Sequence, residues 1–483
     1  MLFPVSRWLP FALVVLAALW LRTHGLASRP MHADEANQAV KTGELLEHGR
    51  YAFDPHDHHG PTLYYAALPI AWLRGETTLA TLTETTVRLV PALAGTLGVI
   101  LLFLLAGPLG HWPALTAAAF MAVAPPSVYY SRYFIQETLL VTFTLAAFVC
   151  AQRWWRTGLT RWALAAGACI GLMQATKASA PLFLCSALAA ILITVRARPV
   201  TRRPRRDIIA ALIAALGVAA LFYSSFGTHF SGLRDAIGTY TAVSTRAASG
   251  SGHEKPWWYY LSLFGWHRDG GLLWQQLAFS TLALCGVLVA FATSQRTLRC
   301  VALYIFFITT ALSLAPYKTP WHTVHLVPGF AFLAASALAA LPMRLFAIAT
   351  AAIVLALQYN QTQLAAFLRP ADARNPYAYV HSSPDVLKIR ALAEAALTRS
   401  PAGPIRIISE EYWPIPWYLR ALPPASVGYW STPPADSDGA LIIASSTQAI
   451  ALRPLLRARY RESYLGLRPD FLLVVFTPIS AAP

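Results

Sequence analysis

The stretch WLPFALVVLAALWLRTHGLASRPMHADEA, residues 8–36, carries a long apolar run that is closely followed by two acids. About 20 apolar residues are needed to cross a hydrocarbon core of roughly 30 Å, so residues 8–24 are predicted to form a transmembrane helix. A cleavable signal peptide is the alternative, with Arg7 as its basic flank. Asp34 and Glu35 then lie just outside the membrane, where carboxylates accept protons, hold metals or bind sugars.

Composition places the whole chain among integral membrane proteins. Of its 483 residues, 56% are hydrophobic and 12% are charged, and the mean hydropathy is +0.48. These values lie far outside the range of soluble globular proteins. The net charge of +16 comes largely from arginines in short loops between apolar segments, which is a topology signal. We therefore expect membrane lipid as a partner and no nucleic acid.

Apolar windows of spanning length recur along most of the chain. They predict a mainly α fold, a polytopic membrane protein of about eleven transmembrane helices with its membrane domain over residues 1–365. The predicted spans are residues 8–24, 86–107, 112–130, 135–152, 161–176, 179–195, 208–225, 272–293, 299–315, 322–341 and 344–360.

Arginines in alternate short loops indicate the orientation, because cytoplasmic loops are enriched in lysine and arginine. We expect a multi-pass protein of the cell inner (plasma) membrane, with its N-terminus in the cytoplasm and the region after residue 360 outside. The loops at 25–85 and 226–271 then share the outer side. The arginines of the inner loops include Arg153, Arg156, Arg196, Arg198, Arg202, Arg205, Arg296 and Arg344. The charged residues expected on the outer side are Asp34, Glu35, Glu137, Lys177 and Lys318.

Both long outer loops are predicted to contain interfacial elements. The apolar stretch 61–73 is too short to span and is interrupted by Pro69, so we expect a helix lying flat at the interface. The segment GHEKPWWYYLSLFGWHRDG, residues 252–270, mixes charges with aromatic residues in a similar way. The run from Ser249 to Gly252 is interpreted as a hinge.

After about residue 366, prolines and charges appear and the apolar runs shorten to strand length. This pattern predicts a small α/β extracytoplasmic C-terminal domain over residues 366–483. Strands are expected at IRIIS (405–409), ALIIAS (440–445) and FLLVVFT (471–477), and helices at 384–399 and 450–462.

The segment EEYWPIPWYLR, residues 410–420, brings acids and aromatic rings together within the C-terminal domain. Aromatic faces and acids are suited to binding the sugar of an acceptor. The same residue types are common where a domain docks on a membrane, and the sequence favours neither alternative. The residues concerned are Glu410, Glu411, Trp413 and Trp417.

Two lysines are expected in tight outer turns: Lys177 in MQATKASAP and Lys318 in LAPYKTPWH. A charged side chain costs about 2.5–3.5 kcal/mol at the centre of a membrane helix, which favours a place at the rim with a partner. Two fixed ammonium groups there would neutralise the phosphate of a lipid-linked donor. Anchoring to lipid headgroups by snorkelling is the alternative.

The segment DPHDHHGP, residues 54–61, packs three histidines and two acids into one turn-rich stretch. Neutral imidazoles and carboxylates suit a divalent metal such as zinc or manganese, which makes His56 and His58 candidate ligands. Consecutive residues converge poorly on one ion, so a substrate-contacting loop and a solvated turn remain as alternatives. No other cofactor is expected.

Several motifs resemble those of the GT-C membrane glycosyltransferases that use polyprenyl-phosphate sugars. The branch is that of the protein O-mannosyltransferases and the lipid A aminoarabinose transferase, of glycosyltransferase 39 type. A closer likeness is to bacterial and archaeal membrane proteins associated with flippase activity in surface glycan pathways. The first likeness rests on MHADEA (31–36), HHGPTLYY (58–65), YYSRYFIQETLL (129–140) and ATKASAP (175–181). The closer one adds GHEKPWWYY (252–260), YKTPWH (317–322), NPYAYVHSSPDV (375–386) and WPIPWYLR (413–420).

The resemblance implies an inverting hexosyl- or pentosyltransferase of the cell envelope that works on the outer leaflet. Asp34, with Glu35 beside it, would take the proton from a hydroxyl of a glycan, lipid or protein acceptor. That hydroxyl would attack the anomeric carbon while polyprenyl phosphate leaves. Helix capping or ion pairing is the structural alternative for Asp34 and for Glu137.

The resemblance also implies a set of residues that bind the substrates. Glu137 would contact the acceptor or a metal, and preorganised cations would stabilise the leaving phosphate. The residues assigned to substrate binding are Glu137, Arg132, Lys177, Lys318, His59 and Tyr64.

A second hypothesis from another class is a flippase, or a flippase-accessory protein, for lipid-linked glycans. A flippase needs ionisable residues at several depths of the bilayer. In this sequence the charges cluster at the two rims and the spans are nearly free of them, which favours the transferase.

Overall fold

The computed structural model describes residues 8–55, 59–194, 200–201, 203–249, 252–293 and 295–479. The chain divides into two compact units. The first comprises Met1–Leu26, Arg50–Ala67 and Arg88–Pro370. The second comprises Ala27–Gly49, Leu68–Val87 and Ala371–Pro483. Besides the C-terminal part of the chain, the second unit thus includes two segments of the loop predicted over 25–85.

Helices overlap every one of the predicted spans, so the predicted mainly helical membrane fold is confirmed. Within the described residues, five helical segments are long and apolar enough to cross a membrane, and the number of eleven spans stays a prediction. Those five are Glu84–Leu109, Pro204–Tyr223, Arg296–Leu314, Pro320–Ala339 and Arg344–Leu368. The helices at the predicted spans are α1 (Leu9–Thr23), α4 (Glu84–Ala106), α5 (His111–Val123), α6 (Pro125–Tyr130), α7 (Glu137–Thr157), α8 (Thr160–Thr176), α9 (Ala180–Thr194), α10 (Pro204–Tyr223), α13 (Leu277–Ala292), α14 (Arg296–Leu314), α15 (Val327–Ala339) and α16 (Arg344–Thr362).

Two predicted spans differ from the structure for local reasons. The span at 112–130 is split into α5 and α6 because Ala124, which precedes Pro125, is extended with ψ 129°. The span predicted from residue 272 begins instead with strand β2 (Leu272–Gln275), which pairs with β1 (Trp266–Asp269). Gly270 and Gly271, both with positive φ, make the tight turn between the two strands.

The predicted outer loops contain further helices. The interfacial helix expected at 61–73 is present as α3, Thr62–Leu73, with Pro69 inside it. Helix α2 (Ala33–His48) and helix α11 (Ser231–Ser249) were not predicted, and α12 covers Tyr259–Leu263. The predicted hinge from Ser249 to Gly252 includes residues 250 and 251, which lie outside the described residues.

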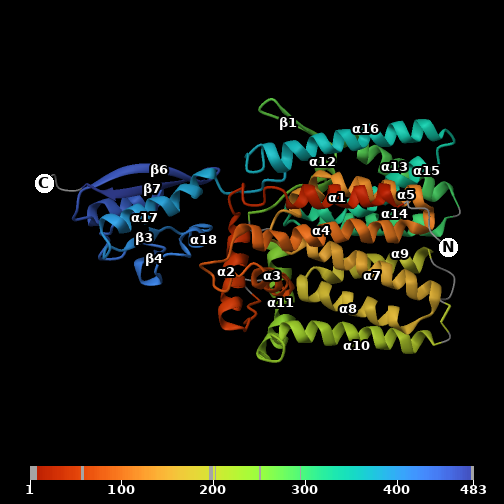
Figure 1. The fold of residues 1–483 in the computed structure, drawn as a ribbon, viewed down its shortest axis with the longest axis horizontal. Coiled ribbons are helices and arrows are strands. Elements are labelled where there is room, and N and C mark those ends of the chain that lie inside the picture. The colour runs from red at the N-terminus through yellow and green to blue at the C-terminus, as the bar shows by residue number, and fades with distance from the viewer. Residues whose placement is uncertain are drawn as a thin grey trace. The chain divides into compact units, whose positions relative to one another are not determined.

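Close backbone contact joins α8 to α10, which run side by side in Figure 1. Gly167 and Gly171 are four residues apart on α8, the spacing of small residues that allows membrane helices to approach closely. A Cβ at Gly167 would overlap the carbonyl oxygen of Ala211 on α10, and a Cβ at Gly171 would come 2.5 Å from that of Ala215. These two glycines therefore set the distance between the helices.

The second unit contains a five-stranded sheet with the order β4-β3-β5-β7-β6. Three strands are parallel to one another: β3 (Ile405–Ile408), β4 (Val427–Trp430) and β5 (Leu441–Ser445). The hairpin β6 (Tyr460–Arg468) and β7 (Phe471–Pro478) joins antiparallel through β7. The helices of this part are α17 (Ile389–Arg399), α18 (Ile415–Leu419) and α19 (Ser446–Leu452), with short turns at Pro384–Lys388 and Arg453–Leu455.

Three of the strands lie where the sequence predicts them, but the helix predicted at 450–462 is wrong in its second half. From Tyr460 onward the chain pairs with β7 as strand β6, and the Tyr460 ring packs on the apolar core around Ile442 and Phe476. A cross-strand partner therefore overrides the helical spacing of the leucines and arginines.

We predict that Gly167→Ala lowers the thermal unfolding midpoint of the purified protein in lipid nanodiscs. Forcing a methyl group into this contact should cost about 1–3 kcal/mol, because Ala211 presents backbone rather than a flexible side chain. Gly217→Ala on α10 is the matched control, since a Cβ there meets nothing within 4 Å. Equal midpoints for the two variants would contradict the close packing of α8 and α10.

Candidate active site

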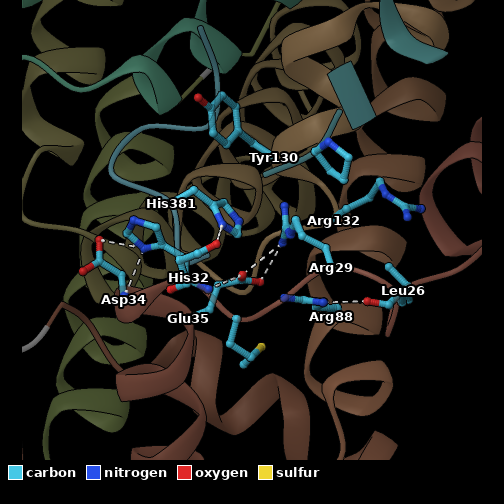
Figure 2. Close-up of polar contacts among 12 residues, drawn as sticks. Leu26, Arg29, His32, Asp34, Glu35, Arg88, Tyr130, Arg132 and His381 are labelled. Carbon is cyan, nitrogen blue, oxygen red and sulfur yellow. Dashed lines mark hydrogen bonds and ion pairs between the residues drawn. The ribbon is translucent and has the colours of Figure 1, made fainter. Parts of the chain in front are cut away.

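Two buried arginines of the first unit hold the chain where α1 ends. Arg132 donates hydrogen bonds to the carbonyl oxygens of His24 at 2.6 Å and Gly25 at 3.1 Å, and its guanidinium lies 4.5 Å from the centre of the Phe367 ring. Arg88 donates to the carbonyl of Leu26 at 2.6 Å (Figure 2). The carbonyls at the end of a helix lack intrahelical partners, so these guanidinium groups stabilise the exit from α1. A substrate role for Arg132 stays a prediction.

The motif MHADEA forms the N-terminus of α2 in the second unit. His32 is the N-cap, and its Nδ1 accepts a hydrogen bond from the Asp34 N–H at 3.1 Å. In return, Glu35 accepts one from the His32 N–H at 3.1 Å, which completes a capping box. The two bonds satisfy N–H groups that the first turn of a helix leaves open.

Glu35 also forms a buried ion pair, which Figure 2 shows beside the capping box. Arg29 donates to both carboxylate oxygens of Glu35 at 3.0 Å. The Glu35 side chain is 0% exposed and that of Arg29 is 6% exposed. A carboxylate that is buried, held in an ion pair and bonded in a helix cap cannot reach the hydroxyl of an acceptor substrate. Asp34 and Glu35 were both predicted to be catalytic. Helix capping and ion pairing, the structural alternative given above for Asp34, are instead the contacts of Glu35.

Asp34 presents its carboxylate to solvent, with 53% of the side chain exposed. Its Oδ2 lies 3.9 Å from His32 Nδ1. The tautomer of His32 follows from its two partners: Nε2 lies 3.1 Å from the carbonyl of Tyr379, which can only accept, and Nδ1 faces an N–H, which can only donate. Nδ1 therefore carries no proton, and His32 orients the backbone of Asp34 without neutralising its carboxylate.

A second histidine, His381, packs against His32. The His381 ring is 1% exposed, and its centroid lies 5.8 Å from that of His32. Burial, together with the nearby charge of Arg29, holds the pKa of His381 well below its usual range. His381 therefore stays neutral at physiological pH and adds no positive charge behind Asp34.

The WPIPWYLR motif packs within the second unit. Trp417 is fully buried, and its Nε1 donates to Glu84 at 2.7 Å. The Arg420 guanidinium lies 3.7 Å from the centre of the Trp417 ring and donates to the carbonyl of Leu82 at 2.8 Å. Of the two alternatives left open for this segment, sugar stacking is excluded for Trp417, because its ring is fully enclosed by protein.

In the first unit, Glu137 and Lys177 form a buried ion pair that joins the first turn of α7 to the end of α8. Glu137 is 2% exposed and Lys177 is 8% exposed. Each charge has the partner that burial requires. The sequence analysis placed both residues at the outer rim, and the structure brings them into direct contact.

Two polar side chains near this pair have buried atoms without hydrogen-bond partners among the described residues. Both amide atoms of Gln136, the residue before Glu137, are buried without a partner among the described residues, and so is Nε2 of His325. His325 and its neighbour His322 both lie within electrostatic range of Lys177, and the Tyr260 hydroxyl lies 3.0 Å from His322 Nδ1. Unmet buried polar atoms are costly, which suggests a site shaped for a polar ligand.

The HGPT segment, residues 59–62, adjoins the same ion pair through the backbone. The Gly60 N–H donates to the carbonyl of Thr176 at 3.1 Å, directly before Lys177. The hydroxyls of Thr62 and Thr176 lie 2.7 Å apart. His59 is half-buried, within electrostatic range of His322. Tyr64 is fully buried against the Tyr51 ring, at a centroid distance of 4.8 Å.

Lys318 lies elsewhere in the first unit, in a turn. Its Nζ donates to the carbonyl oxygens of Ala315 and of Lys255, the latter at 3.1 Å. Burial lowers the pKa of the Lys318 ammonium, which is 2% exposed. These contacts fasten the 253–255 strand segment to residues 316–318. A role in donor binding stays a prediction for this residue.

The metal ligands proposed from sequence, His56 and His58, lie outside the described residues. Elsewhere in the described ranges, no group of three or more histidine, cysteine or acidic side chains is placed to hold a metal ion. The divalent metal therefore stays a prediction.

The neighbours that give each acid its role were not predicted from the sequence. Arg29 and His32 decide between Asp34 and Glu35, and Gln136, His322 and His325 line the surroundings of Lys177. One signal was available, since the spacing of residues 32–35, with glutamate three positions after the cap, is that of a capping box. The contacts of Lys177 with the later histidines carry no such local signal.

Comparison with known proteins identifies the architecture. Residues 67–226 match the family model described as dolichyl-phosphate-mannose-protein mannosyltransferase. ArnT from Cupriavidus metallidurans, solved with undecaprenyl phosphate, superposes with a TM-score of 0.69 over 99% of this chain and 100% of that chain, at 16% identity. The chain has the GT-C glycosyltransferase fold. The predicted resemblance to GT-C glycosyltransferases is thus confirmed, and the likeness to flippase-associated proteins stays a prediction.

Two larger GT-C structures match more distantly. The oligosaccharyltransferase of Archaeoglobus fulgidus, tethered to an acceptor peptide, has a TM-score of 0.55 at 14% identity, over 99% of this chain and 74% of that chain. The arabinofuranosyltransferase AftD from Mycobacteria has a TM-score of 0.53 at 13% identity, over 99% of this chain and 40% of that chain. No curated protein sequence matches this GT-C chain significantly.

We predict that the two neighbouring acids differ sharply in their effect on stability. Glu35→Ala leaves the Arg29 guanidinium buried without its partner and should cost about 3–5 kcal/mol of unfolding free energy. Asp34→Ala removes an exposed carboxylate at a helix N-terminus and should cost less than about 1 kcal/mol. Thermal or denaturant unfolding of both variants in nanodiscs measures the difference. Equal losses would contradict the division of roles between the two acids.

Proposed function

We propose that this protein is an inverting glycosyltransferase that moves a sugar from a polyprenyl-phosphate donor to an acceptor hydroxyl on the extracytoplasmic face of the membrane. The sugar is a hexose or a pentose. One observation carries the donor class: in the first unit, His325, whose buried Nε2 has no partner among the described residues, lines an apolar cavity, which matches a ligand with a charged head and a hydrocarbon chain.

The polar part of this donor site is assigned to Lys177, Gln136 and His325. An ammonium has three donor positions, and Glu137 uses one of those of Lys177. Phosphate oxygens would accept from the remaining positions and from the amide of Gln136. They would also accept from Nε2 of His325 when that nitrogen carries the proton. Binding would give partners to the two donor atoms concerned, Nε2 of Gln136 and the protonated Nε2 of His325.

The apolar part of the donor site is a small, partly open cavity of about 50 Å³. Its walls come from α4, α7, α14 and α15, and His325 belongs to its lining. Leu102, Val141, Phe148 and Phe332 are typical of the other lining residues. Such a surface suits the first isoprene units of a polyprenyl chain. The histidine places the polar end of the cavity beside the Glu137–Lys177 pair.

The base is assigned to Asp34 in the second unit. Its carboxylate is exposed, and its position is fixed by the first turn of α2 and the His32 cap. In the proposed step, Asp34 accepts the proton of the acceptor hydroxyl while the oxygen forms a bond to the anomeric carbon. The bond from that carbon to the phosphate oxygen breaks, and polyprenyl phosphate leaves with the electron pair. A single displacement inverts the anomeric centre.

We predict that Asp34→Asn reduces sugar transfer by about 10²–10⁴-fold, the usual contribution of a general base. The assay measures transfer of radiolabelled sugar from polyprenyl-phosphate donors in proteoliposomes, with kcat and donor KM determined separately. The loss should appear in kcat, because Asp34 is not assigned to the donor. Glu44→Gln is the matched control, since Glu44 is an exposed acid on the same helix that pairs with Lys41 at 3.2 Å.

Undiminished transfer by Asp34→Asn would remove Asp34 as the base. Movement of the donor across the bilayer without any transfer would overturn the transferase in favour of a flippase.

We also predict that Gln136→Met weakens donor binding without lowering the stability of the protein. Replacing a buried amide that lacks partners by an apolar side chain of similar length should leave the unfolding midpoint unchanged or raise it. The same change should raise the donor KM roughly tenfold, the loss expected for one good hydrogen bond to a charged group. A lower midpoint would indicate that the amide is already satisfied in the free protein. An unchanged donor KM would exclude it from the phosphate site.

A further inference from the structure

The carboxyl edge of the five-stranded sheet gathers polar and aromatic side chains that the proposed transfer step does not use. From β3 the chain passes to β4 on one side and then returns to β5 on the other side, so the strand order reverses between β3 and β5. Open α/β sheets bind ligands in the crevice outside the carboxyl ends of strands at such a point. In Figure 1, this edge lies on the side of the sheet that carries α18, and α18 packs against α2 of the same unit.

Three side chains at or just after the ends of β3 and β5 meet at this edge. Glu410 follows the end of β3, and its carboxylate accepts hydrogen bonds from the Gln448 amide and, at 3.1 Å, from the Ser445 hydroxyl at the end of β5. The bond from Gln448 lowers the pKa of Glu410, so the carboxylate is charged at neutral pH. Glu410 is exposed, and its remaining lone pairs face solvent.

Aromatic rings extend the same edge toward β4. The Tyr412 ring lies 5.2 Å from that of Tyr429 on β4 and 6.2 Å from that of Trp413. Tyr429 is 37% exposed, whereas Tyr412 and Trp413 are half-buried. Trp413 thus differs from Trp417, four residues later, whose ring is enclosed by protein. Of the two tryptophans in this segment, only Trp413 leaves part of its side chain exposed.

The charge of the edge is opposite to that of the chain as a whole. Glu411, which is 53% exposed, pairs with Arg468 at the end of β6. Two carboxylates, Glu410 and Glu411, therefore face one guanidinium, in a protein that carries 38 basic and 22 acidic residues. An anionic ligand such as a phosphate, a uronic acid or an acidic lipid headgroup would be repelled from the free Glu410 carboxylate.

We infer that this edge is a binding site for a neutral saccharide. Carboxylate, amide and hydroxyl groups held close together can receive and donate the paired hydrogen bonds that sugar hydroxyls form. The partly exposed aromatic faces offer apolar surface to the C–H face of a sugar ring. In relation to the proposed transferase, on which this part of the inference rests, the site would select a glycan as the acceptor class.

The test uses the full chain in nanodiscs of zwitterionic lipid, without any donor. Neutral mannose-, glucose- and galactose-based oligosaccharides and an anionic uronic-acid oligosaccharide are titrated, and binding is followed by saturation-transfer NMR. At least one neutral oligosaccharide should bind, and the anionic one should not. Trp413→Ala and Glu410→Gln should each weaken binding by roughly tenfold, the change expected when a central contact is removed.

Tyr464→Ala is the matched control, because Tyr464 is a 58% exposed aromatic residue on β6 of the same sheet. It should change the affinity by less than about twofold. Glu410→Gln keeps the size of the side chain, so it decides the outcome if Trp413→Ala fails to fold. Absence of neutral-saccharide binding, equal effects of all three variants, or preferential binding of the anionic sugar or of acidic lipid would each overturn the site. Binding is measured without transfer, so a failed transferase assay would leave this result intact.

Discussion

Burial of charge is the constraint on which this structure depends. In a protein whose helices lie in hydrocarbon, a polar group without a partner costs about 2–7 kcal/mol, so the fold has to supply partners from within. Arg88 and Arg132 donate to the carbonyls at the end of α1, and Lys177 pairs with Glu137. Arg29 pairs with Glu35 in the same way. These contacts fix the ends of helices, where the candidate functional residues lie.

Function is indicated by the polar groups that depart from this constraint. Asp34 is exposed although the acid beside it is buried and paired. Gln136 and His325 are buried but lack partners among the described residues. An exposed carboxylate on a rigid helix start suits proton transfer, and buried donors without partners suit an anionic ligand.

Local patterns predicted much of the architecture. Apolar runs of spanning length gave the positions of the membrane helices, and short apolar runs bounded by turns gave β3, β5 and β7. Both signals depend only on neighbours along the chain. The break at Ala124, the β1–β2 hairpin and strand β6 were missed or mispredicted. The break depends on a preceding-proline effect that hydropathy does not register, and the strands depend on partners across the sheet.

The sequence by itself determined the membrane class, the positions of most helices and the motifs in which the acids and lysines occur, because periodicity, composition and motif matching are local properties. Only the tertiary structure decided what each motif residue does. Arg29 forms an ion pair with Glu35, whereas Asp34 stays exposed. Glu137 forms an ion pair with Lys177, which is 40 positions away in the sequence. Glu84 and Arg420 enclose Trp417 while Trp413 stays at the surface. The physical reason is that burial and pairing are set by residues distant in sequence, whose approach no local pattern records.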